Sequence, residues 1–294
     1  MARYFYDTEF LEGTQKSFFG QSKPTIDLIS IGIVAEDGRE YYAISKDFNL
    51  KEAWNRYDKV VNRHFPLGPE YNKLYWIREN VLRPIYSELL LWEYADKLHV
   101  KINSSEFLRL KEMREQGEIT IKYPHFDKCY KDFKRLLNKY GKTNNQIAKE
   151  LKHFIYEKED VLYNKQEIDF DSVGDVKSKI QFYGYYSAYD HVALCWLFGK
   201  MIDLPKGFPM YTIDLKQSFD NKAESLTTKQ LTDFQYGEGF MNHDVYAPLN
   251  YMKVDYTKAD LLKRHKNYPK QTNEHNALSD AKWNYELYKF LQTL

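Results

Sequence analysis

The sequence predicts an α/β fold with a mixed β-sheet flanked by helices, and three observations lead to this expectation. Residues 4–10 read as a strand that carries two carboxylates one residue apart, with aromatic side chains on either side of them. Residues 26–35 and 40–45 are two further strand patterns on either side of an Asp-Gly turn, which is a strong hairpin signal. After residue 143, helical and strand patterns alternate, as they do in α/β proteins.

The N-terminal third is expected to form a three-stranded meander. Its first strand is followed by a polar, glycine-containing stretch, residues 12–25, which reads as a loop. The second strand spans 26–35, and the third returns over 40–45 after the turn at 36–39. The strand that carries Asp7 and Glu9 is therefore the first one in the sheet.

Helices dominate the middle of the chain. Residues 76–84 read as a short helix stopped by Pro84. Apolar spacing then predicts helices over 85–99, 104–116 and 126–140, so that 85–142 forms a helical insertion. Residues 143–145 are expected to cap a helix over 146–157.

The second half returns to strands and helices in alternation. A polar loop is expected over 159–178, a strand over 180–186, a turn over 187–191, a helix over 192–200 and a strand over 210–215. Residues 220–270 look irregular and form a second insertion, basic near its end, before a closing helix over 274–294. We expect one domain, residues 1–294, that contains both insertions.

Composition limits the classes of function. The chain has 294 residues, and 43 Lys and Arg against 42 Asp and Glu give a net charge of +1, so a nucleic acid would need a local basic patch. No apolar run reaches the ~18 residues of a membrane helix, and strand sequence begins too early for a signal peptide. Cys129 and Cys195 lack metal-ligand spacing, which fits a reducing compartment. We expect a cytoplasmic protein with no membrane partner.

Asp7 and Glu9 are candidate metal ligands. In a strand, residues i and i+2 point to the same face, so the two carboxylates lie side by side. Burying them unpaired costs several kcal/mol or more, and a bound divalent cation is the usual remedy. Hard cations such as Mg²⁺ take oxygen ligands and keep water for a phosphate substrate.

Three further residues complete the candidate site. Asp190 lies between a strand and a helix, where ligands commonly sit in α/β folds, although it could instead cap that helix. His275 and Asp280 lie five residues apart at the start of the closing helix and can face one cleft. Four carboxylates and a histidine suit two divalent ions about 3.5–4 Å apart acting on a phosphodiester. We assign structural roles to Asp214 and His191.

Together, Asp-x-Glu in the first strand, a mid-chain Asp and a C-terminal His-x-Ala-x-x-Asp resemble the DEDDh 3′–5′ exonucleases, which have an RNase H-like fold. Longer matches over 4–10, 28–43, 188–195 and 275–281 resemble the branch of bacterial and phage exoribonucleases that includes mycobacterial RNase AS. The resemblance implies that Asp7, Glu9, Asp190 and Asp280 hold two Mg²⁺ or Mn²⁺ ions and that His275 is the general base.

The same resemblance implies a substrate: single-stranded RNA with a free 3′ end, cut to 5′-mononucleotides in the cytoplasm of a bacterium or a phage-infected host cell. Thr8 and Phe10 are candidate substrate contacts, and Lys263, Arg264 and Lys266 form a candidate basic patch or a merely solvated loop. A homodimer stays open. Two alternatives also stay open: a DNA exonuclease on the same fold, and a binding protein whose insertions hold a partner.

Overall fold

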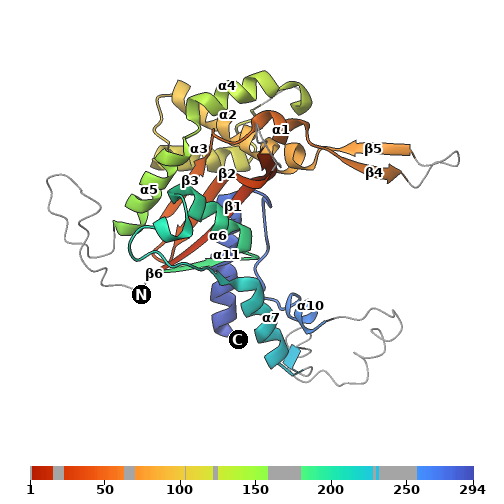
Figure 1. Ribbon diagram of the computed structural model, residues 1–294, viewed down its shortest axis with the longest axis vertical. Coiled ribbons are helices and arrows are strands. Elements are labelled where there is room, and N and C mark those ends of the chain that lie inside the picture. Colours follow the sequence, from red (N-terminus) through yellow and green to blue (C-terminus); the bar gives the residue numbers. More distant parts are fainter. Residues whose placement is uncertain are drawn as a thin grey trace.

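A five-stranded mixed sheet forms the centre of the computed structural model (Figure 1). The structure describes residues 2–15, 23–62, 70–102, 104–121, 125–157, 180–227, 230–231 and 257–294. The strand order is β3-β2-β1-β6-β7, antiparallel from β3 to β1 and parallel from β1 to β7. The strands are β1 (Ala2–Gln15), β2 (Lys23–Ala35), β3 (Glu40–Ile44), β6 (Ile180–Gly184) and β7 (Ile213–Asp214). The predicted α/β class is confirmed, and this mixed sheet flanked by helices is consistent with an RNase H-like fold.

Helices make up most of the remaining described structure. They are α1 (Leu50–Asn55), the π-helix η1 (Arg78–Leu82), α2 (Arg83–Lys97), α3 (Ser105–Glu115), the short helix η2 (Phe126–Lys128), α4 (Tyr130–Tyr140), α5 (Asn144–Tyr156), α6 (Ala188–Phe198), the short helix η4 (Met201–Asp203), α7 (Leu215–Ser225), α10 (Lys258–Leu262) and α11 (Ala277–Thr293). Among the described residues, no helix combines the length and apolar character that crossing a membrane requires.

The first two strands are longer than the sequence suggested. Residues 12–15 and 23–25 were expected to be loop, but they pair with each other or with neighbouring strand residues, as Gly13 does with Thr25. The antiparallel ladder continues through these polar residues because its backbone hydrogen bonds do not depend on side-chain polarity. Residues 16–22 lie outside the described part of the chain.

Alternation along β1 assigns its side chains to two layers. Tyr4 and Tyr6 pack with residues of α5 and α6 on one face of the sheet. Phe5 packs with residues of α7 and α11 on the other face. Because the period of a strand is two residues, Asp7 and Glu9 share the face of Phe5 and point towards α11, whereas Thr8 points towards α6.

The helices expected over 85–142 are present, with α2, α3 and α4 close to the expected segments. These helices share a hydrophobic core with α1 and with Leu11 of β1, Ile29 of β2 and Ile44 of β3. The expected stop at Pro84 is wrong, because Pro84 lies in the first turn of α2, where its missing N–H costs nothing. The helical path instead runs from Trp76 through η1 into α2.

The second half contains further corrections. The helix expected from residue 192 begins at Ala188, so residues 188–191 are helix rather than turn, and the strand expected over 210–215 is only β7. The region 220–270 is not wholly irregular, since it includes the end of α7 and all of α10. The loop predicted over 159–178 and the stretch 232–256 lie outside the described residues.

A hairpin that the sequence did not predict projects from the body of the molecule (Figure 1). Its strands are β4 (Asp58–Asn62) and β5 (Glu70–Leu74), which pair antiparallel as a separate two-stranded sheet. The hairpin leaves the body between α1 and η1, near the C-terminal end of β1.

Candidate active site

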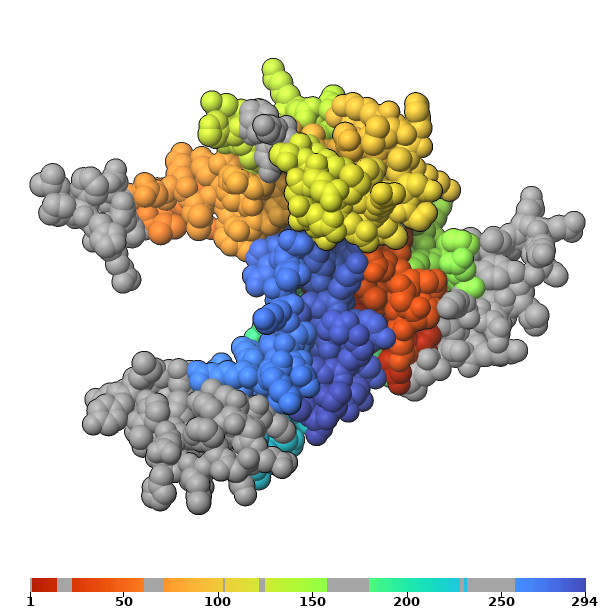
Figure 2. Space-filling view, turned by 180° about the vertical axis from the view of Figure 1, so that it is seen from behind, coloured from red at the N-terminus to blue at the C-terminus, as the bar shows by residue number. Residues whose placement is uncertain are grey.

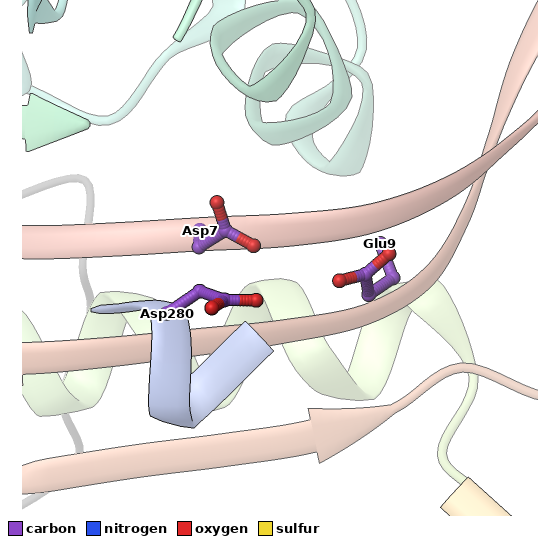
Figure 3. Close-up of side chains that lie close together, drawn as sticks. All are labelled: Asp7, Glu9 and Asp280. Carbon is purple, nitrogen blue, oxygen red and sulfur yellow. The ribbon is translucent and has the colours of Figure 1, made fainter. Parts of the chain in front are cut away.

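Three carboxylates converge between β1 and α11 (Figure 3). Asp7, Glu9 and Asp280 each offer an oxygen, and these atoms lie within 4.8 Å of one another. Asp7 and Glu9 come from consecutive same-face positions of the central strand, and Asp280 comes from the first turn of α11. Glu9 and Asp280 are each only 8% exposed. The strand period had predicted that Asp7 and Glu9 lie side by side.

Close packing of α11 on β2 brings Asp280 to this position. Gly32 pairs directly with Asp7 in the sheet, and a Cβ atom at Gly32 would lie 2.3 Å from backbone atoms of Leu278. Only glycine allows the start of the helix to approach the sheet this closely. One turn past Asp280, the Asn284 amide donates to the carbonyl of Tyr6 at 3.0 Å. The sequence did not single out Gly32 or Asn284, because both contacts join distant segments.

Asp190 reaches the same cleft from the opposite face of the sheet. It is the third residue of α6, 7% exposed, and the N-cap of that helix is Ser187, so the expected strand-end position and the capping alternative are both wrong. Thr8 donates to Asp190 Oδ1 through its backbone N–H at 2.9 Å and its hydroxyl at 2.6 Å. Thr8, predicted to contact substrate, therefore holds Asp190, which stands beside the three close carboxylates.

His275 lies immediately before the N-cap of α11, as predicted. Its φ of 65° is in the left-handed region, and its backbone N–H donates to Asp280 Oδ2 at 2.9 Å. The ring contacts Trp76 edge-to-face, with 4.8 Å between ring centroids. The Gln271 amide donates to the other oxygen of Asp280 at 2.7 Å. Neither Trp76 nor Gln271 was expected from the sequence to neighbour the site.

The electrostatics of this cluster favour a bound cation. Burial, followed by the neighbouring carboxylates, raises the pKa of Glu9 to about 8 and that of Asp7 well above its usual range. Burial raises the pKa of Asp190 to about 6, although the hydrogen bonds from Thr8 oppose the shift, and it also raises the pKa of Asp280. No ion pair joins these four carboxylates to any Lys or Arg within the described part of the chain.

A cleft of about 370 Å³ opens over these groups. Several aromatic side chains line it, and of these only Phe10 was expected from the sequence. Phe10 meets Tyr189 edge-to-face at 5.8 Å, and Tyr186 and Tyr189 are 65% and 52% exposed. The lining residues are Asp7, Thr8, Glu9, Phe10, Tyr185, Tyr186, Tyr189, Asp190, Gln271, His275, Asp280, Trp283 and Asn284. Exposed rings of this kind are suited to stacking on nucleic-acid bases.

The predicted basic patch does not line this cleft. Lys263, Arg264 and Lys266 are exposed just beyond the end of α10, and Lys263 Nζ lies 4.0 Å from Asp260 Oδ1. The two residues assigned structural roles fit those roles. Asp214 caps α7 by accepting from the N–H of Lys216 at 2.7 Å, and His191 Nδ1 bonds the hydroxyl of Thr212 at 3.1 Å.

Comparison with known proteins adds sequence similarity to this geometry. No family model matches the chain. Two curated proteins, from two strains of Mycobacterium tuberculosis, are each 26% identical to it over 224 residues. The matched region covers 75% of this chain and 76% of each relative. Over three quarters of its length, the chain is therefore similar to proteins that are named 3′–5′ exoribonucleases.

Proposed function

We propose that this chain is a metal-dependent 3′–5′ exoribonuclease that removes 5′-mononucleotides from single-stranded RNA. The observation that carries the proposal is the convergence of Asp7, Glu9 and Asp280 within 4.8 Å, in a cleft that also holds Asp190 and His275. The names of the two mycobacterial relatives support the direction of cleavage and RNA as the substrate.

Mg²⁺ or Mn²⁺ fits the donor set. All four candidate ligands are carboxylates, which hard divalent cations prefer, and their combined charge would balance two such ions. We assign Asp7, Glu9, Asp190 and Asp280 to hold them. Bound there, the ions would supply an activated water and neutralise charge on the scissile phosphate.

His275 is placed to serve as the general base. Its backbone is fixed through Asp280, and its ring lines the cleft against Trp76. We propose that a ring nitrogen takes the proton of the attacking water while the 3′-oxygen of the preceding nucleotide leaves. Phe10 and the exposed tyrosines would hold the terminal bases by stacking.

Substitution of the carboxylates tests the site. We expect Asp7→Asn and Asp280→Asn to abolish cleavage of a 3′-hydroxyl RNA while the variants still fold, because each removes a metal ligand. EDTA should abolish cleavage by the wild type, and His275→Ala should lower kcat by ~10²–10⁴-fold. Asp214→Asn is the matched control, since Asn also caps helices, and it should retain full activity. Full activity in Asp7→Asn would refute the assignment.

The choice of substrate is tested separately. RNA and DNA oligonucleotides of one sequence, with free or blocked 3′ ends, should be digested in parallel and the products identified by mass. We expect 5′-mononucleotides from the free RNA and little from the blocked one. Faster digestion of DNA would favour the DNA exonuclease. If no oligonucleotide were cut with Mg²⁺ or Mn²⁺ present, a binding role would be favoured instead.

A further inference from the structure

The projecting hairpin presents unusual surface chemistry. Its strands pair only with each other, and an isolated two-stranded hairpin is marginally stable on its own. It nevertheless exposes large side chains: Tyr57 is 39% exposed, Val60 45% and Tyr71 56%. A solvent-exposed arm of this composition suggests a ligand that contacts it.

The two faces of the hairpin differ. Lys59 lies opposite Lys73 in the register, and directly opposed residues share a face. Contacts confirm the grouping, because the Lys73 ammonium lies 4.3 Å from the Tyr57 ring centroid, and the Tyr57 ring lies 5.7 Å from that of Tyr75. The tyrosine–lysine face consists of Tyr57, Lys59, Tyr71, Lys73 and Tyr75. The opposite face carries Asp58, Val60, Asn72 and Leu74.

Charge on the tyrosine–lysine face points to an anionic ligand. Like charges directly opposite each other on paired strands are destabilising, and Lys59 and Lys73 form such a pair. Neither lysine has a carboxylate within ion-pair distance among the described residues. Phosphate groups would offset this repulsion, and the tyrosine rings between the lysines would stack on bases. Carboxylates of a protein partner would also offset the charge, but a nucleic acid matches the lysines with phosphates and the exposed tyrosine rings with bases.

The base of the hairpin adjoins the carboxylate site. Phe10 lines the cleft over the carboxylates and also a neighbouring cleft of about 350 Å³. Arg56, Asp58 and Trp76, at the root of the hairpin, line that second cleft. Figure 2 shows the hairpin and the segment 258–272 on either side of a hollow at one edge of the molecule. A strand leaving the carboxylates past Phe10 would therefore meet the root of the hairpin on the side of Asp58, next to Tyr57 and Tyr75, where the tyrosine–lysine face begins.

We propose that the tyrosine–lysine face binds single-stranded RNA upstream of the 3′-terminal nucleotides. The proposal rests on the exoribonuclease function for the orientation of the strand, but the binding itself needs no catalysis. The hairpin would hold long substrates between cleavage events, so it would matter for long RNAs and not for a dinucleotide that the two clefts accommodate.

Binding without cleavage is the primary test. Anisotropy of a 5′-labelled 20-nucleotide RNA should be measured in EDTA for Tyr71→Ala and for Lys59→Gln combined with Lys73→Gln. We expect Tyr71→Ala to weaken binding about tenfold, because it removes one stacking contact. The double lysine variant should lower the slope of log affinity against log salt by about 0.7 for each lysine. All these side chains are exposed, so the variants should fold normally.

Matched control variants distinguish an effect of the tyrosine–lysine face from a general effect of substitution. Val60→Ala lies on the opposite face of the same hairpin, and Lys131→Gln removes an exposed lysine from α4. Both should bind the 20-mer like the wild type. In Mg²⁺, the ratio of kcat/KM on the 20-mer to kcat/KM on a dinucleotide should fall about tenfold in Tyr71→Ala and stay constant in the controls.

The outcomes are distinct. Unchanged RNA binding by both hairpin variants would overturn the inference, as would equal losses in the opposite-face control. A change in molecular mass by light scattering, with RNA binding unaffected, would assign the hairpin to protein association and also overturn it. If the wild type cleaved nothing but the hairpin variants still weakened RNA binding, the exoribonuclease proposal would fail and the hairpin inference would stand.

Discussion

Gly32 shows how a single residue without a side chain places a carboxylate of the candidate site. A Cβ atom there would lie 2.3 Å from the backbone of Leu278, and the backbone of a helix cannot move aside as a side chain can. Gly32 also pairs with Asp7, so the contact fixes the distance between the β1 carboxylates and Asp280. Asp280 thus depends on Gly32 for its place as much as on its own helix.

Gly32→Ala should therefore separate the start of α11 from the sheet. We expect kcat to fall by about 10²-fold, because a displacement of about 1 Å can cost this much. The thermal shift produced by Mn²⁺ should shrink in parallel. Gly13→Ala is the control, since the atom closest to its Cβ would be the hydroxyl of Thr25 at 3.0 Å, which can move, and its other neighbours lie at ordinary contact distances. Wild-type kcat in Gly32→Ala would show that α11 adjusts without moving Asp280.

At the scale of elements, periodicity predicted the side-chain positions that depend only on neighbouring residues in the sequence. The two-residue period of a strand was enough to place Asp7 beside Glu9, and the start of the last helix was enough to place His275 before Asp280. The contact of Trp76 with His275 joins segments about 200 residues apart, which no local pattern encodes. The hairpin was missed for a related reason, since its strands are short and lack a buried face to mark them.

The π-helix η1 begins two residues after Trp76, the ring neighbour of His275. Pro84 cannot donate a backbone hydrogen bond, and the chain approaches it through wider turns over Arg78–Leu82. The Asn80 amide donates to the Trp76 carbonyl at 2.9 Å, which ties the tryptophan to this turn. π-Helical turns are frequent at functional sites, and this one lies close in sequence to the tryptophan that contacts His275.

Trp76→Ala should lower kcat about twofold to tenfold, because an edge-to-face pair contributes about 0.5–1.5 kcal/mol to holding the ring. Trp76→Phe should restore most of the rate, since Phe keeps an aromatic neighbour. The measurement is kcat at saturating dinucleotide, with KM recorded alongside. Trp196→Ala, a 50% exposed tryptophan on α6 outside the cleft, should behave as wild type. A change in KM alone would mean that Trp76 contacts substrate and does not position His275.

At the scale of the whole molecule, the carboxylates make folding depend on both pH and metal. Without metal, the folded chain keeps protons on Glu9 and Asp190, whose pKa values are raised to about 8 and about 6, whereas the unfolded chain releases them near their model values of 4.5 and 3.8. The folded state therefore binds more protons than the unfolded state between these limits. Stability from these groups is fully present below about pH 4 and is lost as pH rises towards 8.

In EDTA, Tm should consequently fall between pH 5 and pH 8. The free energy of unfolding drops by roughly 1.4 kcal/mol per pH unit for each group that is protonated only in the folded state. Mg²⁺ or Mn²⁺ should reverse the loss because the cation replaces the protons, so the metal-induced rise in Tm should be larger at pH 8 than at pH 5.5. Thermal unfolding with and without metal at both pH values measures this. Glu9→Gln removes one raised group and should flatten the pH dependence in EDTA, whereas Glu286→Gln, an exposed carboxylate on α11, should leave it unchanged. A wild-type Tm in EDTA that rises from pH 5 to pH 8 would mean that the four carboxylates are solvated and ionised without metal. The cleft would then lack the electrostatic demand for a cation, on which the proposed chemistry depends.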